Sequence, residues 1–246
     1  MKQVAPYYND SLLFSSASKI AADGFVVLEQ LCNEETISVI LDVPRRKSRE
    51  IHSALGDREI GIGSASGYEE ILQRSPGRWD VPIAPQEIGV EDKEMPWWPL
   101  IAAVLGEDAE HSFSGVVSSE PDSPAQYWHI DSPHTSREHR SAHAIHILVA
   151  LHDVPLEMGP TECARGSHIL TNHLSNPSLV IDELVYQHAG TTPESLVNDT
   201  GNDAPQEITS SMTAGSCLVF DDRILHRGLA NKPDDTHHVA YFSYRK

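Results

Sequence analysis

The sequence predicts a mainly β fold, a double-stranded β-helix of the jelly-roll or cupin-like kind with N-terminal and flanking helices. From about residue 112 onward, short β-prone runs alternate with Gly and Pro, which is typical of two facing antiparallel sheets. Helix-like segments come earlier, so we expect a helical part over about 1–111 and a jelly-roll core over about 112–246. All-β units of this length are common as single domains, and one domain over 1–246 is therefore expected.

The first predicted elements are two helices and a strand. Ser15 to Ala22 is expected to form a short helix that stops at Gly24, and Phe25 to Leu28 the strand that follows. A second helix is expected over Glu34 to Leu41, with Asn33 as its N-cap.

The next segments are less regular. Residues 44–68 are charged and contain glycine, so a loop is expected there. Glu69 to Gln73 is expected to form a helical turn. Pro96 to Pro99 opens a further helix that carries Leu100 to Leu105.

The predicted strands of the core are short runs rich in β-branched and aromatic residues. They cover residues 113–118, 127–130, 144–151, 217–220 and 239–244. Between Asn172 and Met212 lies a polar stretch longer than an ordinary hairpin connection, which predicts a lid insertion.

The tripeptide His129-Ile130-Asp131 is the first candidate site. Residues i and i+2 of a strand point to the same side, whereas on a helix they diverge by roughly 200°. One ion can therefore accept both side chains only if the segment is extended, as its aromatic and β-branched neighbours and the flanking Pro124 and Pro133 indicate. In a chain with 14 histidines the tripeptide alone is a weak signal.

A third ligand is expected from His226. Ser216 to Phe220 is typical of a buried strand, Asp221 and Asp222 of a turn, and His226 then stands where an apolar residue would be expected. A lone His in such a place is usually a hydrogen-bonded core residue. Two imidazoles and one carboxylate are, however, the protein ligands of non-haem Fe(II) oxygenase centres, and they leave coordination sites open.

Four segments follow one another in the order of a known family's signatures: residues 20–34, 126–131, 159–168 and 214–231. Through them the chain resembles the phytanoyl-CoA dioxygenase family of Fe(II)/2-oxoglutarate oxygenases over most of its length. The resemblance implies a jelly-roll fold with His129, Asp131 and His226 as the catalytic iron ligands. Halogenating relatives of such enzymes lack the carboxylate, so Asp131 indicates oxygenation or another hydrogen-abstraction outcome.

The resemblance also implies the cosubstrates: Fe(II), 2-oxoglutarate and O2, with ascorbate as an aid in vitro. In this family decarboxylation of 2-oxoglutarate to succinate accompanies oxidation of a small organic molecule, and hydroxylation is the expected outcome. Gln126 and Thr161 match positions that contact 2-oxoglutarate in relatives. A polar strand residue and a turn hydroxyl are the structural alternatives for these two side chains.

The sequence departs from the family at the anchor for the far carboxylate of 2-oxoglutarate. Relatives usually carry an Arg eleven or twelve residues after the distal His, where this chain has His237 and His238. A histidine anchor is one explanation, and an arginine recruited from elsewhere is another, with Arg78, Arg140 and Arg245 as examples. The third is a family-derived metal-binding protein that uses another cosubstrate or lacks turnover. A zinc hydrolase on the same scaffold is a poorer alternative, because the second signature belongs with oxygenases.

Composition disfavours some classes of binding partner. Lys and Arg number 18 and Asp and Glu 36, so the formal charge is 18 − 36 = −18, which disfavours nucleic acid. No run approaches the ~18 apolar residues of a membrane span. Three cysteines without a secretory signal favour reduced thiols and a cytoplasmic location. The oligomeric state is left open.

The expected substrate is a free small molecule, such as an intermediate of specialised biosynthesis. A CoA thioester carries several phosphate charges and calls for a basic cluster near the site. The sequence offers only Arg45 to Lys47 with Arg49, far from the motifs along the chain.

Overall fold

The computed structural model describes residues 9–55, 72–89, 91–177, 179, 191–196 and 204–246. Its strands form two antiparallel sheets. The major sheet has seven strands in the order β1 (Phe25–Leu28), β8 (Cys217–Asp221), β5 (Ala144–Ala150), β10 (His237–Arg245), β4 (Glu110–Ser119), β3 (Arg78–Pro82) and β2 (Leu72–Ser75). The minor sheet has three in the order β7 (Glu207–Thr209), β6 (Thr161–Ala164) and β9 (His226–Gly228). This architecture confirms the predicted jelly roll.

Helices flank the sheets. The longer ones are α1 (Asp10–Asp23), α2 (Glu34–Leu55) and α3 (Trp98–Leu105), and α4 (Ser167–Leu170) is a single turn. Short 3-10 helices cover η1 (Pro85–Ile88), η2 (Asp92–Glu94), η3 (Leu156–Met158) and η4 (Pro193–Leu196). Asn9 caps α1 through its side chain, and Gly24 ends the helix in the left-handed conformation at φ 85°, which glycine adopts without strain.

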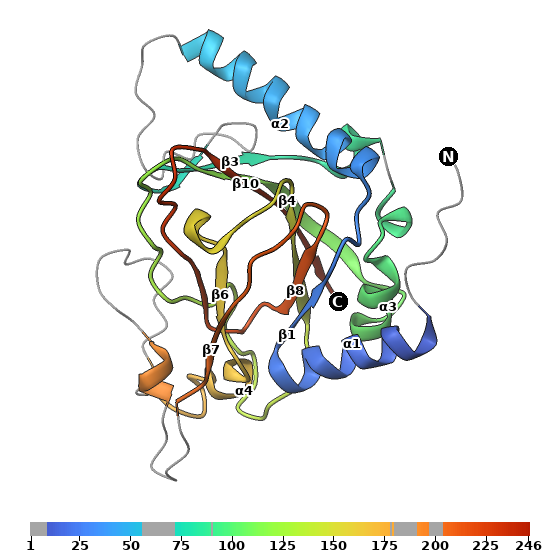
Figure 1. Cartoon of the computed structure of the whole chain (residues 1–246). Coiled ribbons are helices and arrows are strands. Elements are labelled where there is room, and N and C mark those ends of the chain that lie inside the picture. The colour runs from blue at the N-terminus through green and yellow to red at the C-terminus, as the bar shows by residue number, and fades with distance from the viewer. Residues whose placement is uncertain (1–8, 56–71, 90, 178, 180–190, 197–203) are drawn as a thin grey trace.

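The two faces of the major sheet have different surroundings. One face, here called the outer face, packs against α1, α2 and α3 in the largest apolar cluster. The other, the inner face, looks toward the minor sheet. Figure 1 shows this order of layers, with β6 and β7 on one side of β1 and β8 and helices α1 and α3 on the other.

The centre of the outer face is apolar. Alternate residues of three central strands point to it and are at most 1% exposed: Ile145, Ile147, Val149, Val219, Ala240, Phe242 and Tyr244. Trp97 lies against Phe242, with ring centroids 4.6 Å apart, and its indole N–H donates to Tyr244 Oη. Removal of these side chains from water stabilises the fold.

Several predicted elements agree with the structure. Strand β1 has the predicted bounds, β5, β8 and β10 differ by one or two residues at an end, and α3 begins at Trp98 as the Pro-Trp-Trp-Pro run indicated. Strand β4 starts three residues before its predicted beginning. Helix α1 starts at Asp10 rather than at the predicted Ser15, because the side chain of Asn9 caps the helix there.

Other predictions were wrong. Residues 44–55, expected to be a loop, continue α2 past Pro44, because Arg, Lys and Glu are good helix formers even where the segment is highly charged. Leu72 and Gln73 belong to strand β2 rather than to a helical turn. Strands β2, β3, β6 and β7 were not predicted, because three to five residues carry too little periodicity to recognise.

The segment predicted as a lid is only partly described. Glu207–Thr209 forms β7 and pairs with β6, so this part belongs to the minor sheet. Residues 178, 180–190 and 197–203 lie outside the described residues, and the lid remains a prediction. Within the described chain, no helix has the length and hydrophobicity needed to cross a bilayer.

Candidate metal centre

The predicted iron motif lies against strand β9. His129 and His226 form an antiparallel bridge, in which each backbone N–H donates to the other's carbonyl at 3.0 and 2.9 Å. The N–H of Asp131 donates to the carbonyl of Asp222 at 2.9 Å. Residues 127–130 make only this one bridge rather than the regular strand predicted, but their extended course still places His129 and Asp131 at one site.

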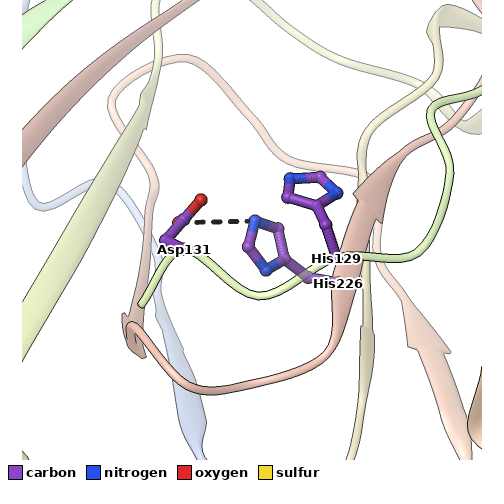
Figure 2. Close-up of side chains that lie close together, drawn as sticks. All are labelled: His129, Asp131 and His226. Carbon is purple, nitrogen blue, oxygen red and sulfur yellow. Dashed lines mark ion pairs between the residues drawn. The ribbon is translucent and has the colours of Figure 1, made fainter. Parts of the chain in front are cut away.

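The structure brings the three predicted ligands together. One nitrogen of each His and one oxygen of Asp131 all lie within 4.8 Å of one another (Figure 2). Asp131 Oδ2 is 3.6 Å from His226 Nε2, and the centroids of the His129 and His226 rings are 4.3 Å apart. These distances suit three groups that share one cation.

Both imidazoles are oriented by the backbone in the same way. His129 Nδ1 donates to the carbonyl of Tyr127 at 2.8 Å, and His226 Nδ1 donates to that of Ile224 at 3.0 Å. Each Nδ1 therefore carries the hydrogen and each Nε2 keeps its lone pair for a metal ion. Burial, followed by the effect of the nearby His226, lowers the pKa of His129 to about 4, so this ring is neutral at physiological pH.

The donor set fits Fe(II). Two imidazole nitrogens and one carboxylate oxygen form the facial triad of non-haem iron oxygenases. Among the described residues no fourth His, Cys, Asp or Glu joins the group. These three groups could hold one ion and would leave the remaining positions of an octahedral ion to other molecules.

An aromatic wall from the major sheet stands beside the triad. Phe220 lies 4.9 Å from His226 between ring centroids and stacks on His146 at 5.4 Å. His146 Nε2 is 3.8 Å from Asp131 Oδ2, and Phe113, half exposed, lies beside His146 at 5.6 Å. His146 is not among the residues predicted for the site, and the structure places it beside Asp131.

One signal could have identified His146. It is the single polar residue in the run from Ala144 to Ala150, where every neighbour is apolar. A polar side chain inside a buried strand needs a partner, and a ligand carboxylate is such a partner.

The predicted 2-oxoglutarate contacts Gln126 and Thr161 lie together at Gly228. Gln126 Oε1 accepts the N–H of Gly228 at 2.9 Å, and Thr161 is the register partner of Gly228 across β6 and β9. Gly228 follows His226 by two residues along β9, so a side chain at position 228 would point to the same side of the strand as His226. Both assignments remain predictions, but the two residues share one neighbourhood next to the metal ligands.

His237 and His238 point in different directions. His237 is 6% exposed and lies on the inner face, paired in register with Ser119. The Nδ1 of His238 bonds to Ser118 Oγ at 2.8 Å. Burial lowers the pKa of both rings, to about 4 for His237, so neither carries a charge at neutral pH.

The three arginines considered as replacements differ in burial. Arg140 and Arg245 are exposed, whereas Arg78 is buried on β3. Among these arginines, Arg78 alone is enclosed by the fold.

A pocket of about 440 Å³ adjoins the motif segment, lined by Gln126 to Trp128, Thr191, Thr192 and Arg227 among others. None of the three metal ligands lines it. The Arg227 guanidinium stacks 4.4 Å from the Trp128 ring, and its Nε donates to Glu162 at 2.8 Å. The charge of Arg227 is thus already paired within the protein.

Comparison with known proteins identifies the family. The model of the phytanoyl-CoA dioxygenase (PhyH) family matches residues 20–239, so the chain belongs to this family. Among the curated proteins nothing matches the chain significantly.

Solved structures of similar fold include two enzymes of nogalamycin biosynthesis. The non-heme alpha ketoglutarate dependent epimerase SnoN from nogalamycin biosynthesis has a TM-score of 0.66 at 19% identity, covering 97% of this chain and 82% of its own. SnoN in complex with Fe3+, alpha ketoglutarate and nogalamycin RO has a TM-score of 0.61 at 21% identity, covering 97% and 85%. The carbocyclase SnoK from the same biosynthesis has a TM-score of 0.60 at 17% identity, covering 94% and 83%. At these identities the likeness concerns the fold.

Proposed function

We propose that the protein is a non-haem Fe(II)/2-oxoglutarate-dependent dioxygenase that oxidises a small organic molecule, with hydroxylation as the expected outcome. The observation that carries the proposal is the convergence of His129, Asp131 and His226 within 4.8 Å, with both Nε2 atoms available. Family membership supports it, as does the binding of Fe3+ and alpha ketoglutarate, the same compound as 2-oxoglutarate, by SnoN.

Each part of the site then has a role. His129, Asp131 and His226 would hold Fe(II), which with 2-oxoglutarate and O2 supplies the oxidant that removes hydrogen from a C–H bond. The backbone carbonyls of Tyr127 and Ile224 fix the two imidazoles. The wall of Phe113, His146 and Phe220 would exclude water from the side of the major sheet.

We propose a free small molecule rather than a CoA thioester as the substrate. The basic cluster Arg45 to Lys47 belongs to α2, which packs on the helical side of the major sheet. Lys47 is already engaged there, since its Nζ donates to Glu87 at 2.7 Å and to the carbonyl of Pro82. This cluster is therefore poorly placed to bind phosphates at the metal centre.

The test is cosubstrate turnover. Purified protein reconstituted with Fe(II) and ascorbate is expected to convert 2-oxoglutarate to succinate slowly without substrate, and Asp131→Ala is expected to abolish this turnover and weaken Mn(II) binding at least about 100-fold. Succinate is measured by chromatography, and His139→Gln, an exposed histidine outside the triad, serves as the control. Equal succinate formation by Asp131→Ala and wild type would disprove the proposal.

A family-derived protein without turnover is the second candidate, favoured by His237 and His238 at the usual arginine position. That candidate predicts both rings in solvent. The 6% exposure of His237 speaks against it. Its experimental signature is metal binding with no succinate at any pH.

A further inference from the structure

A buried arginine without an acidic partner lies close to the candidate metal centre. Arg78 is 4% exposed, and among the described residues no carboxylate forms an ion pair with its guanidinium. Burial lowers its pKa to about 10, so the group stays charged at neutral pH. Because an unpaired buried charge is strongly destabilising, a bound anion would stabilise the guanidinium at this position.

Among the described residues, the hydrogen-bond partners of Arg78 are all neutral. Its Nη1 donates to Ser119 Oγ at 2.6 Å, and its Nη2 donates to the carbonyls of Pro124 and Leu229 at 3.1 and 2.5 Å. Its Nε is enclosed and has no hydrogen-bond partner among the described residues. These bonds fix the guanidinium in place but leave both its charge and one donor unsatisfied.

The guanidinium lies on the side of β9 to which the metal ligand points. Gly228 has no side chain, and a Cβ built there would lie 3.1 Å from Arg78 Nη1 and 2.7 Å from Gln126 Oε1. Gly228 is two residues after His226, a step of roughly 6.6 Å along a strand. The guanidinium of Arg78 thus lies at the strand position next to His226 on the same side of β9, where Gln126 and Thr161 also lie.

The register of the major sheet explains how Arg78 reaches this place. Arg78 of β3 and His237 of β10 are both register partners of Ser119 on β4, so the three residues form one row on the inner face. Neighbouring strands are about 4.8 Å apart. The side chain of Arg78 contacts Ser119, and the next residue in this row is His237, at the position where relatives usually carry their arginine.

We infer that Arg78 binds the far carboxylate of 2-oxoglutarate, and that a guanidinium from β3 replaces the arginine that is missing from β10. This assignment rests on the proposed function and names a binding residue for it. His237 is the nearest alternative, and its Nδ1 is also enclosed without a hydrogen-bond partner among the described residues. A neutral imidazole offers no charge to a carboxylate, whereas a guanidinium does.

The inference is tested by binding, without turnover. The full chain is loaded with Mn(II) in the absence of oxygen, and its affinities for 2-oxoglutarate and pyruvate are measured by calorimetry. Pyruvate keeps the 2-oxo acid that chelates the metal but lacks the far carboxylate. Arg78→Gln is expected to weaken 2-oxoglutarate binding about 10- to 100-fold, as for loss of a charge-assisted hydrogen bond, and to change pyruvate binding less than about twofold.

Two matched variants control for position and charge. Arg245→Gln removes an exposed arginine of β10 and is expected to leave both affinities unchanged. The double variant Arg78→Gln with His237→Arg moves the guanidinium to the usual family position, and at least about tenfold recovery of 2-oxoglutarate affinity over Arg78→Gln is expected.

His237→Gln keeps the inference testable if Arg78→Gln fails to fold, because it retains Arg78. Its affinity for 2-oxoglutarate is expected to stay within about threefold of wild type. A loss of tenfold or more in His237→Gln with unchanged pyruvate binding would assign the anchor to the histidine and overturn the inference. Folded Arg78→Gln that binds 2-oxoglutarate as wild type does, or that loses both ligands equally, overturns it as well. If wild type itself binds no 2-oxoglutarate, the proposed function fails together with the anchor.

Discussion

The two faces of the major sheet both carry buried residues, but these residues differ in chemistry. The outer face carries residues such as Ile147 and Phe242, which are at most 1% exposed, under the helices. The inner face carries Arg78, Ser119 and His237, also nearly inaccessible, yet polar or charged. Burial of apolar groups stabilises the fold, whereas burial of polar groups costs stability unless they find partners. The difference teaches that the same strands stabilise the fold on one side and, under the proposed function, bind ligands on the other.

The largest effect is expected from the outer face. Phe242→Ala removes a ring that packs on Trp97 and should lower the free energy of unfolding by about 3–5 kcal/mol, because the cavity cannot be filled by its neighbours. Urea denaturation measures the loss. Phe113→Ala on the inner face, where the ring is half exposed, is the control and should cost less than about 1.5 kcal/mol. Equal losses at both positions would remove the distinction between the faces.

An intermediate effect is expected from pH. The pKa of His237 is about 4 in the fold and about 6.5 in the unfolded chain, so the unfolded state holds the extra proton between these values. Its contribution to stability is therefore fully present above pH 6.5 and is lost as the pH falls toward 4. Acidification from pH 7.5 to 4.5 should destabilise wild type more than His237→Gln, by up to about 2 kcal/mol.

The comparison between wild type and His237→Gln isolates this residue. Burial raises the pKa of Asp222 to about 8, which gives a pH dependence of opposite sign, but this contribution is common to both proteins and cancels in the difference. Urea denaturation at several pH values provides the data. Parallel stability curves for the two proteins would show that His237 does not titrate as an inner-face residue should.

The smallest effect is expected at Gly228. Gly228→Ala places a methyl group 2.7 Å from Gln126 Oε1 and 3.1 Å from Arg78 Nη1, so both side chains must move. We expect a loss of about 1 kcal/mol in the free energy of unfolding, and several-fold weaker 2-oxoglutarate binding with pyruvate binding preserved. Calorimetry and urea denaturation measure the two effects. Unchanged 2-oxoglutarate affinity would separate Gly228 from the ligand face.

The sequence predicted the outer face better than the inner one. Strands such as β5 and β8 are nearly continuous apolar runs, so their positions are visible without any knowledge of their neighbours. The grouping of two candidate metal ligands was also predictable, because His129 and Asp131 are two residues apart and a strand places such a pair on one side. His226 required the family resemblance, since nothing local distinguishes it from a core histidine.

The remainder of the site depends on pairing between distant segments. Arg78 reaches the inner-face row only through the register of β3, β4 and β10, and β3 is a five-residue strand that the sequence did not reveal. The approach of His146 to Asp131 likewise depends on contact between the motif segment and β5, which meet only in the folded chain. Such contacts depend on tertiary structure, and local patterns in a single sequence do not reveal them.

The backbone carbonyls that bond to His129 and His226 affect which metal ion the proposed site would hold in isolated protein. Because Tyr127 and Ile224 already fix both rings, a divalent ion can enter without prior rearrangement of the chain. The affinity of nitrogen and oxygen ligands for divalent metal ions rises from manganese through iron to nickel and copper. A preformed site of this kind would therefore discriminate little against nickel and copper. The metal bound at the site would then depend on which metal ions are supplied during expression. The metal content of freshly isolated protein, measured by elemental analysis, should vary with the growth medium.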